Sequence, residues 1–233
     1  MSVAITTKSV EAPSSAVRLA LLWQNSVGKK ALMAVTGIIL FLFVVGHLIG
    51  NLQVYSGADK LDAYARFLHE HVIPLWIVRL VLLATVGTHA LAGILVTLEK
   101  QKARPVAYFT KANLQGTVAS RTMIWSGLLI LAFVVYHLLH LTFGTVHPSF
   151  RPLAAYENVV NGFRVTGAAV AYIVSMVGVG FHLWHGLYSM SQSLGFRHPR
   201  YTPTIRAAAA LLATLLALGN ISIPVAVLTG FVG

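Results

Sequence analysis

Five long stretches without a single charged residue constrain this chain more than any other feature. They cover residues 31–50, 80–98, 122–146, 165–194 and 207–233. Each is long enough to cross a hydrocarbon core of about 30 Å at a helical rise of about 1.5 Å per residue. A β-barrel would show shorter segments of alternating polarity instead. The sequence therefore predicts an all-α fold, an integral membrane bundle of five transmembrane helices spanning about residues 29–52, 72–99, 120–145, 165–194 and 205–231.

The composition supports a membrane protein and excludes several kinds of site. Hydrophobic residues make up 57% of the chain and charged residues 10%, whereas about a quarter of the residues of a soluble domain are charged. The chain has no cysteine, which excludes disulfides, thiolate metal sites, cysteine-held iron–sulfur clusters and covalently attached c-type haem. No Gly-x-Gly-x-x-Gly nucleotide fingerprint, no second domain and no repeat of convincing period is evident.

The basic residues predict how the chain lies in the membrane. The net charge is +11, and with the N-terminus inside, 12 of the 17 Lys and Arg residues fall in cytoplasmic segments. This asymmetry favours an N-terminus in the cytoplasm and a C-terminus outside, so topology accounts for the charge and no nucleic acid partner is expected. Residues 1–27 form a cytoplasmic N-terminal segment, with an amphipathic piece at residues 14–24 predicted to be a short interfacial helix. Residues 28–233 form the transmembrane domain.

Ten histidines are present, and several lie deep inside the apolar stretches. An ionisable group at membrane depth is costly, and this favours a functional role; the alternative is a neutral histidine that hydrogen-bonds across helices. Four different predicted helices carry such residues, which makes the alternative less convincing for the set as a whole. The candidates are His47, His89, His137 or His140, and His182 or His185.

Their depths fall at two levels. His47 and His137 lie roughly 24–27 Å from the predicted cytoplasmic edge, and His89 and His182 roughly 15–18 Å from it. Two histidines at one level on different helices are what a six-coordinate haem iron needs. A metal ion held by a His-x-x-His pair is an alternative, but Asp or Glu ligands are lacking nearby.

Haem propionates need cationic partners near the membrane interface. Five basic residues at span edges are candidates, of which two are expected to serve: Lys29, Lys30, Arg79, Arg121 and Arg164. Each is also explained as a topology determinant or as a side chain that extends to the interface.

At this point the sequence resembles a known family, the cytochrome b558 subunit of succinate dehydrogenase, the single-chain, five-helix, two-haem anchor also found in related fumarate reductases. The resemblance covers roughly residues 25–200 and is carried by the order of short motifs: Gly46-His47-Leu48, Arg79 before His89, Tyr136-His137-Leu138 and Phe181-His182-Leu183. It implies that His47 and His137 ligate an outer haem b and that His89 and His182 ligate an inner one, with His140 and His185 as the runners-up. Some fumarate-reducing relatives carry a glutamate, proposed as part of a proton path, where this chain has Gly180, so the resemblance does not imply such a path here.

The resemblance also implies partners and a location. A flavoprotein (FAD) subunit and an iron–sulfur subunit of succinate dehydrogenase would dock on the cytoplasmic face of a bacterial cytoplasmic (inner) membrane, and electrons would pass through the haems to a membrane quinone, menaquinone by family class. The outer segment 64–71 offers polar candidates for a quinone site: Tyr64, Arg66, His69, Glu70 and His71; a solvated loop is the alternative. The rival functions are a stand-alone transmembrane cytochrome b, a fumarate reductase counterpart, a transporter with histidine relays, and a scaffold.

Overall fold

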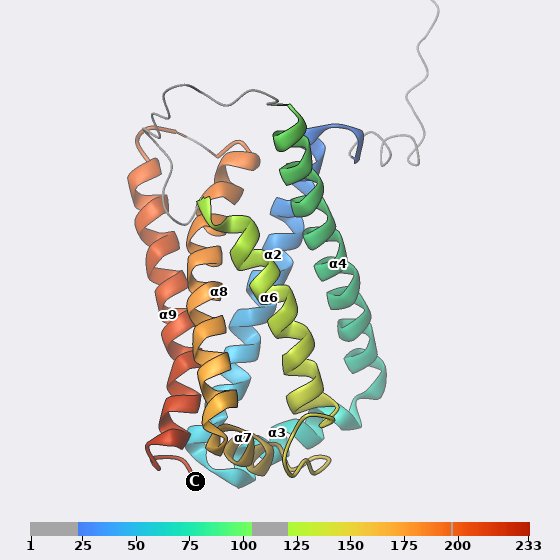
Figure 1. The fold of residues 1–233 in the computed structure, drawn as a ribbon, viewed down its shortest axis with the longest axis vertical. Coiled ribbons are helices and arrows are strands. Elements are labelled where there is room, and N and C mark those ends of the chain that lie inside the picture. The colour runs from blue at the N-terminus through green and yellow to red at the C-terminus, as the bar shows by residue number, and fades with distance from the viewer. Residues whose placement is uncertain (1–22, 104–120, 197) are drawn as a thin grey trace, which may run out of the picture.

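Five long helices run side by side in the computed structural model, which describes residues 23–103, 121–196 and 198–233 (Figure 1). All five are long and apolar enough to span a membrane, which confirms the predicted fold class. The described residues contain no strand. The spanning helices are α2 (Ser26–Asn51), α4 (Val72–Lys102), α6 (Met123–His137), α8 (Thr166–Ser193) and α9 (Thr202–Leu228). The π-helical turn η2 (Leu138–Thr142) continues α6, and the two together make a span of 20 residues.

Four of these helices form a bundle, and the fifth lies outside it. Helix α2 packs against α4 on one side and α8 on the other, while α6 packs against α8 and touches α4. Helices α2 and α6 are therefore diagonally opposed, as are α4 and α8. Helix α9 packs along α8 at the edge of the bundle. A side chain that points to the bundle centre from one helix consequently faces a side chain from the diagonal helix.

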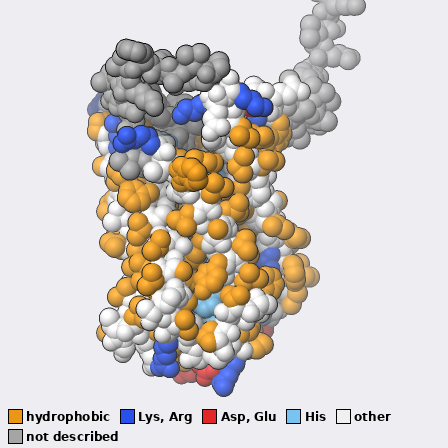
Figure 2. Space-filling view, viewed as in Figure 1, with side chains coloured by type: hydrophobic (Ala, Val, Ile, Leu, Met, Phe, Trp, Pro, Cys, Tyr) orange, Lys and Arg blue, Asp and Glu red, His pale blue; other side chains and the backbone are white. Residues whose placement is uncertain are grey.

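The surface of the bundle suits a lipid environment. Large apolar side chains are exposed along the spans, among them Ile73 at 75%, Leu83 at 72% and Trp125 at 71%. Figure 2 shows apolar side chains across the middle of one face, with Lys and Arg mainly toward the two ends. In water such a surface would be costly, whereas lipid tails solvate it at no cost.

Two short helices close one end of the bundle, which we call the cap end. They are α3 (Ala58–Glu70), between α2 and α4, and α7 (Ala155–Arg164), between α6 and α8; both lie across the same end in Figure 1. In α3 the inward residues Leu61, Tyr64, Ala65 and Leu68 are less exposed than Arg66 and Phe67. Their i, i+3, i+4, i+7 spacing is that of an amphipathic helix. Residues 64–70, part of the segment predicted to be outer, are thus helical and not a loop, while Arg66, His69 and Glu70 are exposed.

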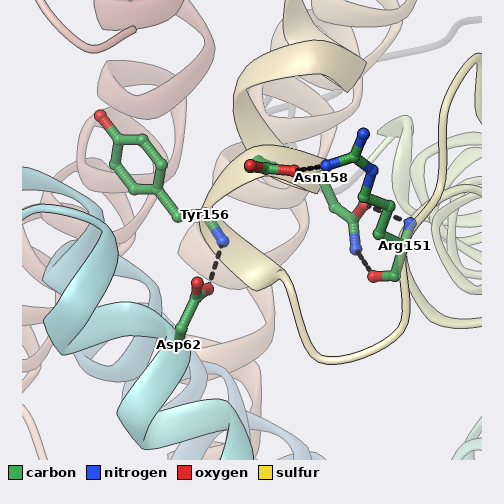
Figure 3. A network of polar contacts seen from close by, with 5 residues as sticks. Asp62, Arg151, Tyr156 and Asn158 are labelled. Carbon is green, nitrogen blue, oxygen red and sulfur yellow. Dashed lines mark hydrogen bonds and ion pairs between the residues drawn. The ribbon is translucent and has the colours of Figure 1, made fainter.

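The two cap helices are tied together by a hydrogen bond between distant parts of the chain. The backbone N–H of Tyr156, in the first turn of α7, donates to the Asp62 carboxylate of α3 at 2.9 Å (Figure 3). This N–H has no partner within its own helix, so Asp62 caps α7 from α3. The preceding loop is fixed by Asn158, whose amide bonds both the N–H and the carbonyl of Arg151, at 2.9 and 2.7 Å.

The main cluster of buried apolar residues lies beneath the cap helices. It joins Leu61 of α3 and Phe163 of α7 to Tyr172 of α8 and Ile223 of α9. The opposite end of the bundle, which we call the far end, holds the start of α2 and the ends of α4 and α8 (Figure 1). The predicted interfacial helix at residues 14–24 lies almost entirely outside the described residues.

Candidate haem-binding site

Two of the predicted histidines face each other across one diagonal of the bundle, near the cap end. The ring centroids of His47 on α2 and His137 on α6 are 5.7 Å apart, with the ring planes at 89°. We call these residues the cap-end pair. Nδ1 of His137 lies 3.2 Å from the hydroxyl oxygen of Tyr172 on α8.

A second pair spans the other diagonal. The ring centroids of His89 on α4 and His182 on α8 are 6.2 Å apart, with the ring planes at 61°; we call these residues the far-end pair. Nδ1 of His89 lies 3.0 Å from Oγ1 of Thr36 on α2. Nδ1 of His182 lies 3.2 Å from Oγ of Ser126 on α6. Each histidine of this pair therefore meets a hydroxyl from a neighbouring helix.

The spacing of the two pairs follows from these contacts. Thr36 precedes His47 by eleven residues on α2, and Ser126 precedes His137 by eleven residues on α6. Because Thr36 and Ser126 mark the level of the far-end pair, the helical rise separates the two pairs by about 16 Å along the bundle. The count gives the same separation on α2 and on α6.

The two halves of the bundle are related by an internal repeat, although no single period runs along the chain. Helices α2 and α6 share Phe-Val-Val-x-His-Leu at residues 43–48 and 133–138, each preceded by a hydroxyl residue and a glycine. Helices α4 and α8 share Gly-x-His-x-x-x-Gly at residues 87–93 and 180–186. The motifs of α2 and α6 are 90 residues apart, and those of α4 and α8 are 93 residues apart, so the repeat has no single period along the chain. The first half, α2 and α4, contributes one histidine to each pair, and so does the second half, α6 and α8.

The residues present fit a haem whose iron is bound by two imidazoles. Two metal–nitrogen bonds of about 2 Å, with about 1 Å from each nitrogen to its ring centre, separate the centroids by about 6 Å, close to the two separations observed. Within the described residues no group of three or more His, Asp or Glu side chains is placed to hold a metal ion. A pair of imidazoles alone suits a metal whose other four positions come from a porphyrin.

The runner-up histidines occupy different positions. His140 is 1% exposed and lies with its Nδ1 3.1 Å from the hydroxyl of Tyr172. It belongs to the π-helical turn η2 (Leu138–Thr142), where the N–H of Phe143 bonds the carbonyl of Leu138. The wider turn ends the α-helical register after His137. The structure also sets His182, and not His185, against His89.

Small residues near the histidines serve partly in helix packing. A Cβ on Gly50 would lie 2.7 Å from the Tyr64 ring, and one on Gly178 would lie 2.8 Å from Leu129. These glycines therefore let α3 and α6 approach α2 and α8 closely, which is the ordinary use of glycine in membrane bundles. Gly37 and Gly127 lie directly against the rings of His89 and His182, where a Cβ would be 3.5 Å from Cε1.

The basic candidates differ in their surroundings. Lys29 is 3% exposed and pairs with Glu99 at 2.7 Å, joining α2 to α4 at the far end. Arg79 stacks on Trp76 at 5.1 Å; it precedes His89 by ten residues, as Tyr172 precedes His182, so it lies near the level of the cap-end pair. Lys30, Arg121 and Arg164 are exposed.

The quinone candidates lie on two faces of α3 and, for His71, at its C-terminal cap. Tyr64 lies against Gly50, one turn from His47 on α2. Arg66, His69, Glu70 and His71 are exposed, and Nδ1 of His69 and of His71 each meets a backbone carbonyl of the preceding turn, at 2.8 Å. Only Tyr64 of this set contacts the bundle near a histidine pair.

Fold and site together define a polytopic helical membrane protein with paired histidines inside a four-helix core. A model of the succinate dehydrogenase/fumarate reductase transmembrane subunit family matches residues 97–221. The chain belongs to this family, and it is therefore a membrane anchor subunit of a succinate dehydrogenase or fumarate reductase complex. No curated protein and no solved structure matches the chain.

Proposed function

We propose that the chain is the dihaem cytochrome b anchor of a succinate:quinone oxidoreductase, which carries electrons from the iron–sulfur subunit to a membrane quinone, menaquinone, through two b haems. The observation that carries this proposal is the pair of facing imidazoles on each diagonal of the bundle. His47 and His137 would hold one haem, and His89 and His182 the other. When bound, each haem would supply a one-electron carrier.

The residues of the chain contribute binding, orientation and exclusion of water. Four helices present one imidazole each to the bundle centre. Next to the cap-end pair, the cap helices α3 and α7 pack with Tyr172 of α8 in the buried apolar cluster. His47 and His137 are themselves half-buried. With the pairs about 16 Å apart along the bundle, the two sites would lie in the two halves of the membrane. Arg79 is the basic candidate best placed for a propionate at the cap-end level.

The positive-inside rule supports the proposed orientation. Of the described basic residues, seven lie at the far end and five toward the cap end. The far-end residues are Lys29, Lys30, Lys100, Lys102, Arg121, Arg200 and Arg206, and the others are Lys60, Arg66, Arg79, Arg151 and Arg164. The far end would therefore face the cytoplasm of a bacterium, where the flavoprotein and iron–sulfur subunits dock, and the cap end would face outward. A quinone site beside Tyr64 would then lie on the outer side.

Haem counting in the purified chain tests the proposal. We expect a reduced-minus-oxidised spectrum with a b-type band and two haems per polypeptide; no haem, or one, would contradict it. Purification through a tag on this chain should also bring down a flavin-containing and an iron–sulfur protein. Two haems without these partners would favour the stand-alone cytochrome.

A further inference from the structure

Two buried hydroxyls stand in matching positions beside the far-end pair, one on each half of the internal repeat. Thr36 and Ser126 are both 8% exposed. Each is followed by a glycine, Gly37 or Gly127, against which the imidazole of His89 or His182 lies. The distances from hydroxyl to Nδ1 are 3.0 and 3.2 Å. This matched contact occurs twice, from helices that contribute no histidine to the pair.

The hydroxyl protons are already committed to the backbone. Thr36 donates to the carbonyl of Leu32 at 2.7 Å, and Ser126 donates to the carbonyl of Met123 at 3.0 Å. A hydroxyl has one proton and two lone pairs. Each oxygen therefore accepts from the imidazole, which places the imidazole proton on Nδ1 and leaves the lone pair on Nε2.

We infer that Thr36 and Ser126 are positioning residues for the far-end haem: they fix His89 and His182 as Nδ1–H tautomers with Nε2 directed to the iron. This inference rests on the proposed function. An acceptor on the second ring nitrogen fixes the ring orientation and makes the ligand more basic. A more basic ligand stabilises the ferric state, so the two hydroxyls lower the midpoint potential of the far-end haem.

The cap-end pair lacks this arrangement. His137 shares the Tyr172 hydroxyl with His140, and in the described part of the chain the ring of His47 has no hydroxyl partner. The two haems would therefore differ in midpoint potential, because only the far-end histidines each have a hydroxyl acceptor of their own. A change at Thr36 or Ser126 should affect one haem and leave the other as it was.

Redox titration of Thr36→Val and Ser126→Ala tests the inference. We expect both variants to keep two haems and to shift the potential of one haem upward, with a change on the order of twofold to fivefold in its ferric-to-ferrous ratio at fixed potential. Thr36→Ser keeps the hydroxyl and should restore the original value. Thr85→Val and Ser175→Ala are matched controls, because these residues are equally buried and bond the carbonyls of Val81 and Ala171. Potentials identical to those of the controls would overturn the inference.

A second measurement separates this inference from the proposed function. Histidine ¹⁵N chemical shifts of the full chain, produced under haem limitation, report the tautomer directly. We expect Thr36→Val to lower the Nδ1–H population of one histidine and Thr85→Val to leave it unchanged. If the chain bound no haem, the proposed function would fail, but the ¹⁵N shifts would still report the tautomer. Equal Nδ1–H populations in the unmodified chain, Thr36→Val and Thr85→Val would refute the role of Thr36.

Discussion

Nδ1 of His140 lies 3.1 Å from the hydroxyl oxygen of Tyr172, and this contact holds the second histidine of the third span against the fourth. The His140 ring also stacks on Tyr136, with centroids 5.4 Å apart. On its other side the His140 ring lies against Gly162, where an added Cβ would be 2.8 Å from Cε1 of His140. His140 is thus a packed and hydrogen-bonded member of the cap region, whereas His137 faces His47.

Replacing His140 should therefore affect stability and spare the cofactor. We expect His140→Ala to retain two haems and to destabilise the protein by about 2–4 kcal/mol, because it opens a cavity and removes a partner of Tyr172. Haem content and the thermal midpoint in detergent measure the two effects. His185→Ala serves as the control and should retain the haems with a smaller loss of stability. Loss of a haem in His140→Ala would show that His140, and not His137, is the ligand.

The bond from Tyr156 to Asp62 should hold α7 on α3. Asp62→Ala removes the acceptor of a partly buried backbone N–H at a helix N-terminus, and we expect a cost of about 1–2 kcal/mol. Hydrogen exchange at the Tyr156 amide should accelerate. Asp59→Ala, in the exposed first turn of the same helix, should leave that exchange rate unchanged. Equal rates in the two variants would show that the carboxylate does not cap α7.

Gly50 should be needed for the seating of Tyr64. A Cβ at this position would lie 2.7 Å from the ring and 2.9 Å from its hydroxyl oxygen, so we expect Gly50→Ala to destabilise the protein by about 1–3 kcal/mol. The double variant Gly50→Ala/Tyr64→Ala should lose less than the sum of the single losses. Gly46→Ala, one turn earlier and with no atom within 4 Å of the added Cβ, should have little effect. If the loss in the double variant equalled the sum of the two single losses, the added Cβ would not act through the Tyr64 ring.

The Lys29–Glu99 pair should show the asymmetry of a buried charge. Glu99→Gln leaves a lysine that is 3% exposed without its carboxylate, and because Glu99 itself is 43% exposed we expect a loss of about 1–3 kcal/mol. Lys29→Met removes the buried charge and should cost less. Glu157→Gln breaks an exposed pair with Arg151 and should change stability by about 0.5 kcal/mol or less. Thermal midpoints that rank Lys29→Met below Glu99→Gln would contradict this account.

The fold class could be predicted because span length depends only on uncharged stretches and helical rise. The cap helices could not, although Leu61, Tyr64, Ala65 and Leu68 follow an amphipathic spacing. Helix α3 has only 13 residues and α7 only 10, and such short helices form because tertiary contacts stabilise them. The bond between Asp62 and Tyr156 joins residues 94 positions apart, which no local pattern contains.

The depths of the candidate histidines could be predicted from the sequence, but the side chains that contact them could not. Counting residues from the basic edges separates His47 and His137 from His89 and His182, because depth is linear in residue number. Spacing alone could not choose between His137 and His140, since the π-helical turn that separates their directions leaves no clear sign in the sequence. Thr36, Ser126 and Tyr172 were missed; the hydroxyl-glycine pair eleven residues before each cap-end histidine is the signal that could have found the first two.

The pairing of the four histidines is tested most directly by redox titration of the four single variants, His47→Ala, His89→Ala, His137→Ala and His182→Ala. Because each haem would be held by one diagonal of the bundle, His47→Ala and His137→Ala should lose the same spectral and potentiometric component. His89→Ala and His182→Ala should lose the other component. Loss of one component by both His47→Ala and His89→Ala, or retention of both haems by any of the four variants, would contradict the account.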